Sequence, residues 1–150
     1  MTVSDEFPGP TPQLTVRDTD AAVRFYRAVF DADETLRNKA PDGRVLHCEL
    51  LVCGGRLLLH DEFPEMGDAA PAGGPTGVML HLFVPDVDAT FARAVEAGAT
   101  GLMPPADAYW GDRYAQIEDP FGHRWSLATP REEVPVDDYQ RRADDYWAGQ

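Results

Sequence analysis

The chain repeats itself at an interval of 68 residues, the distance from Leu14 to Leu82. Identical residues recur at this interval near the start and near the end of each half, and chance would not place them at both ends. We therefore interpret the chain as a duplicated module. The repeated pairs are Leu14 and Leu82, Val16 and Val84, Asp18 and Asp86, Asp20 and Asp88, Ala21 and Ala89, Gly54 and Gly122, Arg56 and Arg124, and Leu59 and Leu127.

Each half shows the same order of predicted elements: a strand, a helix and three further strands. Apolar residues at helical spacing predict a helix after Asp18 or Thr19, either of which suits an N-cap. Asp86 or Asp88 takes this place in the second half, where Gly98 ends the helix. The predicted strands span residues 11–16, 34–38, 44–52 and 56–61 in the first half, and 78–84, 100–103, 113–118 and the run after the Asp119-Pro120-Phe121-Gly122 turn in the second.

The two predicted modules are residues 11–61 and 78–129. Residues 1–10 are interpreted as a flexible lead-in, and residues 62–77, rich in glycine and proline, as a linker or a flap over a binding site. The tail, residues 130–150, is predicted to contain a helix. Its apolar stripe would pack onto its own domain or onto a partner subunit, and core packing is the simpler expectation. The stripe consists of Tyr139, Ala143, Tyr146 and Trp147.

Composition narrows the class of protein and its partners. Thirteen basic against 26 acidic residues give a net charge of −13, which repels phosphate backbones and anionic lipid headgroups. We therefore expect neither a nucleic acid nor a membrane as a partner. No secretory signal and no apolar run of about 20 residues is present, so we expect a cytoplasmic protein. Cys48 and Cys53 are expected to be two buried free thiols.

One repeated motif and one turn motif connect the chain with a known family. V-x-D closes the first strand of each half, at Val16-Arg17-Asp18 and Val84-Pro85-Asp86, and D-P-x-G forms the last hairpin turn. This pattern resembles the vicinal oxygen chelate superfamily of glyoxalase I, bleomycin-resistance proteins, extradiol dioxygenases and fosfomycin-resistance enzymes. The runs LHLFVPDVDATFARAVEAGA, WGDRYAQIEDPFGHRWSLAT and DEFPEMG are similar to its phosphonate-operon glyoxalase-like subgroup.

The resemblance implies an α+β fold of two tandem βαβββ modules. Their strands would form a cup-shaped mixed sheet, completed in a homodimer, whose cleft receives a small organic molecule. Metal-using members take ligands from the first and last strands of each module, typically His or Gln on the first and Glu on the last.

These ligand positions can be located in the chain by counting from the motifs. The first-strand positions fall on Thr11 and Met79, and the last-strand positions on Leu58 and Ser126. Gln13 and His81 lie two residues further on, so each shares a face with the family position. His60 keeps the parity of Leu58 and is the remaining imidazole within reach. Because no carboxylate occupies either last-strand position, no metal cofactor is expected, and a bound divalent metal is disfavoured.

Three residues are candidates for catalysis without a metal. His81 would face the cleft as a general base; the alternative is a hydrogen-bonded core histidine. His47 and Glu49 share one face of a strand and would orient an imidazole against a carboxylate; the alternative is a solvated pair at a sheet edge.

The remaining candidates are for ligand binding. An aromatic plate beside a charged pair suits a planar or anionic organic ligand, and the alternative is that Trp110 covers the core while Asp112 forms a local ion pair. The predicted ligand-binding residues are Gln13, Phe83, Trp110, Asp112, Arg113, Tyr114 and Ser126. Two functions stay open: a metal-independent lyase or isomerase of glyoxalase type, and a non-catalytic protein that sequesters a drug or metabolite.

Overall fold

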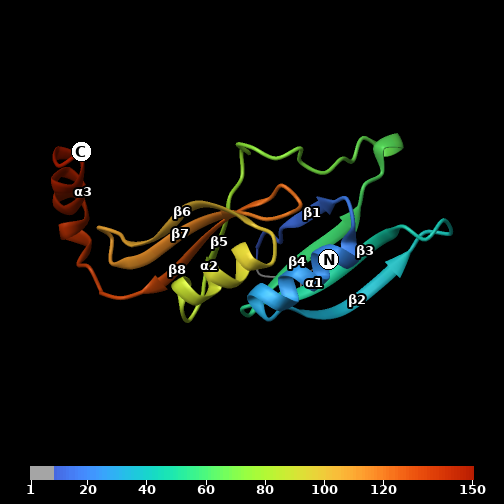
Figure 1. The fold of residues 1–150 in the computed structure, drawn as a ribbon, viewed down its shortest axis with the longest axis horizontal. Helices are drawn as coiled ribbons and strands as arrows, with labels where there is room; N and C mark the ends of the chain where they lie inside the picture. The colour runs from blue at the N-terminus through green and yellow to red at the C-terminus, as the bar shows by residue number, and fades with distance from the viewer. Residues whose placement is uncertain (1–8) are drawn as a thin grey trace. The chain divides into compact units, whose positions relative to one another are not determined.

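The computed structural model describes residues 9–150, so most of the predicted lead-in at residues 1–10 lies outside the described residues. The chain divides into two compact units, Met1–Gly74 and Pro75–Gln150. Each unit contains a four-stranded mixed sheet with a helix between its first two strands, and the second unit has a further helix near the end of the chain (Figure 1). The predicted α+β fold with two βαβββ modules is confirmed.

The two sheets have the same topology. The first strand of each module pairs in parallel with the last, and the other neighbours are antiparallel, giving the orders β1-β4-β3-β2 and β5-β8-β7-β6. The elements of the first unit are β1 (Gln13–Val16), α1 (Thr19–Phe30), β2 (Asp33–Lys39), β3 (Val45–Val52), β4 (Gly55–Asp61) and the 3₁₀ turn η1 (Pro64–Met66). Those of the second unit are β5 (Leu80–Phe83), α2 (Val87–Glu96), β6 (Thr100–Asp107), β7 (Asp112–Glu118), β8 (Arg124–Pro130), the 3₁₀ turn η2 (Val136–Asp138) and α3 (Tyr139–Ala148).

Both module helices begin with the same cap. The carboxylate of Asp18 accepts a hydrogen bond from the backbone N–H of Ala21 at 3.0 Å, and that of Asp86 accepts one from Ala89 at 3.1 Å. Each cap satisfies an N–H group that has no partner within the helix. Of the alternatives that the sequence left open, Asp18 and Asp86 are therefore the capping residues.

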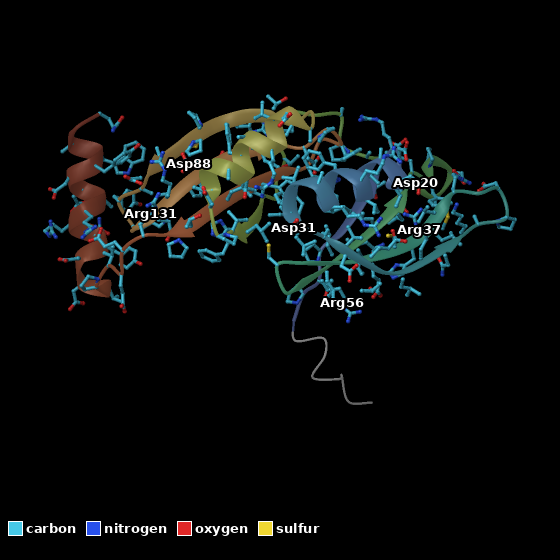
Figure 2. All side chains as sticks on the ribbon, turned by 60° about the horizontal axis from the view of Figure 1, so that its bottom comes forward. Asp20, Asp31, Arg37, Arg56, Asp88 and Arg131 are labelled. Atoms are coloured by element: carbon cyan, nitrogen blue, oxygen red, sulfur yellow. The ribbon has the colours of Figure 1, made fainter. Side chains whose placement is uncertain are left out.

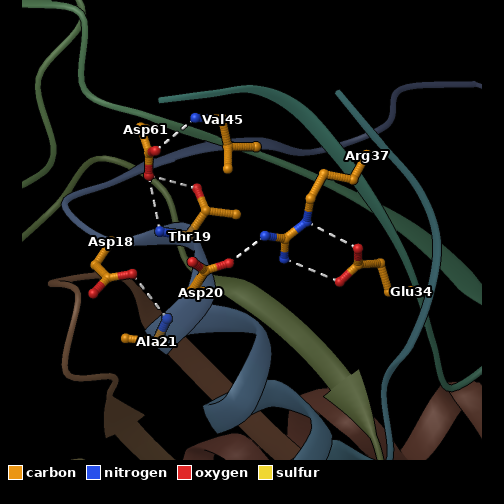
Figure 3. A network of polar contacts seen from close by, with 8 residues as sticks. All are labelled: Asp18, Thr19, Asp20, Ala21, Glu34, Arg37, Val45 and Asp61. Carbon is orange, nitrogen blue, oxygen red and sulfur yellow. Dashed lines mark hydrogen bonds and ion pairs between the residues drawn. The ribbon is translucent and has the colours of Figure 1, made fainter. Parts of the chain in front are cut away.

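A second contact ties the start of each helix to the end of the module's last strand. In the first unit, Asp61 Oδ1 accepts hydrogen bonds from the N–H (2.9 Å) and the hydroxyl (2.8 Å) of Thr19, and Oδ2 accepts one from the N–H of Val45 at 2.7 Å (Figure 3). In the second unit the hydroxyl of Thr129 accepts from the N–H of Val87 at 2.9 Å. Thr129 lies 68 residues after Asp61. Both modules therefore keep a side-chain contact between the last strand and the start of the helix, which we call the latch, with a carboxylate as the acceptor in the first module and a hydroxyl in the second.

The structural repeat has one offset that the sequence interval does not show. Glu49 pairs with Leu58, whereas Gln116 pairs with Ser126, so the second hairpin contains one residue more. The last strands are related by 68 residues and the strands before them by 67. With this offset the fully buried Cys48 and Leu50 correspond to the fully buried Ala115 and Ile117. The structural counterparts of His47 and Glu49 are therefore Tyr114 and Gln116.

Three expectations from the sequence need correction. Strand β6 runs four residues past the predicted end at Met103, to Asp107, through two prolines that an edge strand with an irregular register tolerates. Cys48 is buried, but Cys53 is exposed, because it forms the β3–β4 turn with Gly54 at positive φ. The stripe of α3 is not core, since Tyr146 is 48% and Trp147 is 70% exposed.

Within residues 9–150, no helix is long and apolar enough to cross a membrane.

Candidate functional site

The second sheet has one face covered by α2 and another that its own unit leaves uncovered, which we call the open face. Ala115, Ile117 and Leu127 point to the covered face and are fully buried. Strand pairing sets His81 beside Ser126, and Ser126 beside Gln116, on the open face. The next row of the same face carries Phe83 and Tyr114, on either side of Ala128.

His81 is held on the open face by one hydrogen bond and two rings. Its Nδ1 lies 2.7 Å from the hydroxyl of Ser126, which is 4% exposed. The ring of Phe83 meets the imidazole edge-on at 4.8 Å, and Tyr114 stacks on it at 6.3 Å with an interplanar angle of 22°. The hydroxyl of Tyr114 accepts a hydrogen bond from Gln116 Nε2 at 2.9 Å. The imidazole is exposed and yet fixed in orientation.

The row of ring contacts continues from Tyr114 along the unit. Trp110 contacts Tyr114 edge-on at 5.1 Å and Tyr109 at the same distance. Tyr109 in turn contacts Tyr146 of α3 at 5.6 Å, and Trp147 follows at 5.7 Å. Seven rings, from Phe83 to Trp147, therefore form one unbroken row within the second unit. Sequence reasoning assigned Tyr146 and Trp147 to the core; the signal for a surface role was their place beside Asp144 and Asp145.

The two charged residues near Trp110 have protein partners. Asp112 Oδ2 accepts a hydrogen bond from Trp110 Nε1 at 3.0 Å, which orients the indole. Arg113 pairs with Asp88 of α2 at 2.8 Å and with Asp107 at 3.2 Å. Asp88, labelled in Figure 2, lies on the helix, so the guanidinium of Arg113 extends toward α2.

In the first unit His47 and Glu49 form a hydrogen-bonded pair. His47 Nε2 lies 3.1 Å from Glu49 Oε1, and Arg56 of β4 donates to Glu49 Oε2 at 2.7 Å. The hydrogen bond from His47, together with the charge of Arg56, lowers the pKa of the Glu49 carboxyl below its usual range. Strand β3 lies inside the sheet, so this pair is not at a sheet edge.

The residues at the family's last-strand metal positions, and the first-strand residues that lie beside them, do not fit a hard divalent cation. Gln13 lies beside Leu58, and His81 lies beside the neutral Ser126, so neither pair includes a carboxylate. His60 is buried, with Nδ1 2.8 Å from the carbonyl of Asp61 and Nε2 3.2 Å from the hydroxyl of Thr15. Among residues 9–150, no three His, Cys, Asp or Glu side chains converge as a metal site would require.

Comparison with known proteins gives the family. Residues 10–127 match the Glyoxalase/Bleomycin resistance protein/Dioxygenase superfamily. The chain belongs to this superfamily. The resemblance expected from the V-x-D and D-P-x-G motifs is confirmed, while the phosphonate-operon subgroup stays a prediction. The match ends before the tail, so α3 lies outside the part that the superfamily shares.

Three relatives illustrate the likeness. An uncharacterized protein of Mycobacterium bovis is 44% identical over 137 residues, covering 89% of this chain and 90% of its own length. The crystal structure of TioX from Micromonospora is 31% identical and covers 81% of this chain and 99% of that one, with a TM-score of 0.62. A gene product from Arabidopsis thaliana of known structure is 29% identical and covers 81% and 98%, with a TM-score of 0.64.

Proposed function

We propose that the protein binds a small organic molecule on the open face of the second sheet, in contact with His81. The observation that carries the proposal is the fixed imidazole, with Ser126 on Nδ1 and Tyr114 stacked against the ring. A rotatable surface histidine would lose side-chain entropy when a ligand bound. His81 is already oriented, as a binding or catalytic group must be.

For catalysis we propose a lyase or isomerase of glyoxalase type that works without a metal. If Nδ1–H donates to the hydroxyl of Ser126, Nε2 is a free base that faces the ligand. In an isomerisation, Nε2 would take a proton from a carbon next to a carbonyl group and return it to the neighbouring atom, which leaves the imidazole unchanged. His47 and Glu49 are a second acid–base pair, proposed to act on a ligand of the first module.

The second candidate is sequestration without chemistry. The observation that favours it is the row of rings at Phe83, His81, Tyr114 and Trp110, because neighbouring aromatic side chains bind a planar ligand without any reacting group. A homodimer, which the superfamily resemblance implies, belongs to both proposals and is checked by light scattering after gel filtration.

The binding proposal is tested by thermal unfolding against a panel of carbonyl metabolites, aromatic natural products and drugs. A ligand at 100 times its dissociation constant should stabilise the fold by about 2.7 kcal/mol. His81→Ala should abolish that stabilisation, and Ser126→Ala, which leaves the imidazole unoriented, should reduce it. His123→Ala, a histidine in the β7–β8 turn, is the control. A ligand that stabilises His81→Ala as much as the wild type would refute the proposed site.

Catalysis and sequestration are separated by following the bound ligand by NMR in the presence of a chelator. Turnover that persists with chelator and disappears in His81→Ala supports the metal-free enzyme. Tight binding without turnover supports sequestration. Stoichiometric metal in protein purified without a chelator, lost in His81→Ala, would contradict the metal-free proposal.

A further inference from the structure

The tail of the chain closes a pocket against β6, β7 and the loop between them. The cavity has a volume of about 280 Å³, and its walls include Tyr109, Trp110 and Tyr114 on one side and Tyr146 and Trp147 of α3 on the other. Met103, Pro104 and Ala106 complete an apolar wall. We call it the tail pocket. It uses residues beyond position 127, so the superfamily match does not account for it.

The tail is held in place by contacts that belong to its own unit. The carbonyl of Gly111 accepts hydrogen bonds from the N–H groups of Arg131 and Glu132, both at 3.0 Å. A Cβ atom at Gly111 would come within 2.4 Å of the Glu132 carbonyl oxygen, so the chain can pass this close only because a glycine is there. Arg142 of α3 pairs with Glu132 and donates to the carbonyl of Tyr109 at 3.4 Å. These contacts position α3 over the pocket.

The two rings that α3 contributes to the tail pocket are largely exposed to solvent. Trp147 is 70% and Tyr146 is 48% exposed, although Tyr146 already touches Tyr109. Exposed large aromatic side chains that line a concave surface mark a ligand site more often than a fold requirement. A cavity of this size accommodates one ring or two fused rings.

Charge decides which kind of ring the pocket favours. Asp107 is the charged residue in the pocket wall, with a side chain that is 79% exposed. The guanidinium groups nearby are engaged with carboxylates, Arg113 with both Asp88 and Asp107, and Arg142 with Glu132. Residues 131–150 contain six acidic and three basic side chains. The faces of five electron-rich rings and an acidic surrounding attract a cation and repel an anion.

We propose that the tail pocket binds a planar aromatic cation, such as a ring system with a quaternary nitrogen. The ring would stack between Trp110 and Trp147, with its charge over the faces of the aromatic rings. The inference goes beyond the proposed function, because it does not depend on proton transfer at His81. The row of rings from Tyr114 to His81 makes the tail pocket contiguous with the open face.

The test is isothermal titration calorimetry of the full chain with three bicyclic probes of similar shape. N-methylquinolinium is the cation, quinoline the neutral analogue and 1-naphthoate the anion. The cation should bind about fivefold more tightly than quinoline, as expected for a cation over partly desolvated rings. 1-Naphthoate should bind more weakly than either.

Variants place the probe in the pocket. Trp147→Ala should weaken N-methylquinolinium by about fivefold or more, while Trp147→Phe should retain most of the affinity. Asp107→Asn should change the affinity for the cation by less than about twofold, because the Asp107 carboxylate is already paired with Arg113. Val136→Ala and Asp137→Asn are the matched controls, since both residues are exposed in the tail and lie outside the pocket wall. Circular dichroism melting checks that each variant folds.

His81→Ala separates this inference from the proposed function. If His81→Ala retains the affinity for N-methylquinolinium and Trp147→Ala loses it, the tail pocket is supported whatever happens on the open face. The reverse result would place the ligand on the open face and overturn the tail pocket. Equal affinity for the three probes would overturn the charge preference. A dimer that dissociates in Trp147→Ala, with no probe bound, would mean that a second chain covers these rings.

Discussion

At the scale of single residues, the ionisation of Glu49 makes the stability of the first module depend on pH. Because hydrogen bonding from His47 and the charge of Arg56 lower its pKa in the folded protein, the folded state binds a proton at Glu49 less readily than the unfolded chain does. The contribution is therefore fully present above the unfolded pKa of about 4.3, and it is lost as the pH falls through the lower folded value.

We expect Glu49→Gln to lower the free energy of unfolding at neutral pH, and the difference from the wild type to shrink steadily below about pH 4. Urea unfolding at a series of pH values measures this difference. Glu133→Gln, at an exposed position of the tail, is the control and should follow the wild-type curve. Curves for wild type and Glu49→Gln that stay parallel down to acid pH would show that the pair with His47 and Arg56 contributes nothing.

The two cysteines also differ at this scale, because one is in the core and the other is in a turn. Cys48 is fully buried, whereas Cys53 is exposed at φ +48°. Burial raises the pKa of both thiols, so access to the reagent is what distinguishes them. Ellman's reagent should therefore label one thiol per chain quickly and the second only after unfolding. Cys53→Asn should remove the fast phase and keep the fold, because asparagine before glycine suits a turn with positive φ. Two fast thiols would contradict the burial of Cys48.

At the scale of elements, the latch between helix and last strand is the feature that both modules keep. In the first module, the Asp61 carboxylate satisfies the N–H and hydroxyl of the buried Thr19 and the N–H of Val45, and the adjacent Asp20–Arg37–Glu34 ion pairs surround the same helix end (Figure 3). In the second module, the hydroxyl of Thr129 accepts a hydrogen bond from only one donor at the start of the helix, the N–H of Val87.

We expect Asp61→Ala to reduce the free energy of unfolding by about 2–3 kcal/mol, because three donors lose their acceptor. Thr129→Ala should cost about 1 kcal/mol, since one helix N–H is left without its partner. Denaturant unfolding compares the two variants, with Asp137→Ala at an exposed tail position as the control. A larger loss for Thr129→Ala than for Asp61→Ala would contradict the difference between the two latches.

The elements themselves were largely predictable, and what was missed has a physical reason. The helices and their caps follow from apolar spacing and from Asp18 and Asp86, which act locally. The offset between the hairpins depends on how each turn closes, so the 68-residue interval alone would have matched His47 with Ala115 rather than Tyr114. Strand β6 continues through Pro104 and Pro105 only because it lies at the sheet edge, which local sequence does not reveal.

Part of the candidate site was likewise predictable from the sequence, and part was not. Alternation along the strands put His81 and Ser126 on one face, and the parallel pairing of β5 with β8 makes them neighbours. Tyr146 contacts Tyr109, although the two residues are 37 positions apart in the sequence (146 − 109 = 37). The contact forms because the tail is hydrogen-bonded to the carbonyl of Gly111. No spacing rule links such positions, so the tail pocket was not predictable from the sequence.

At the scale of the whole molecule, excess negative charge is spread over both units. Residues 1–74 contain thirteen acidic and seven basic side chains, and residues 75–150 contain thirteen and six. Even if each of the 13 basic residues pairs with one carboxylate, 13 of the 26 carboxylates remain unpaired and repel one another. Exposed ion pairs are worth about 0–1 kcal/mol each, so screening them costs little. Screening the net repulsion between carboxylates therefore stabilises the folded state by more than the loss of these ion pairs destabilises it.

We therefore expect the unfolding temperature to rise when salt is increased from about 10 mM to about 150 mM, which shortens the Debye length from about 30 Å to about 8 Å. Differential scanning fluorimetry measures the rise. NaCl, KCl and Na₂SO₄ should give the same curve when plotted against ionic strength, because screening depends on charge and not on the identity of the anion. A greater rise with sulfate at equal ionic strength would point to exclusion of the salt from the protein surface. An unfolding temperature that falls with ionic strength would mean that the ion pairs around Arg37, Arg44 and Arg113 outweigh the repulsion between unpaired carboxylates.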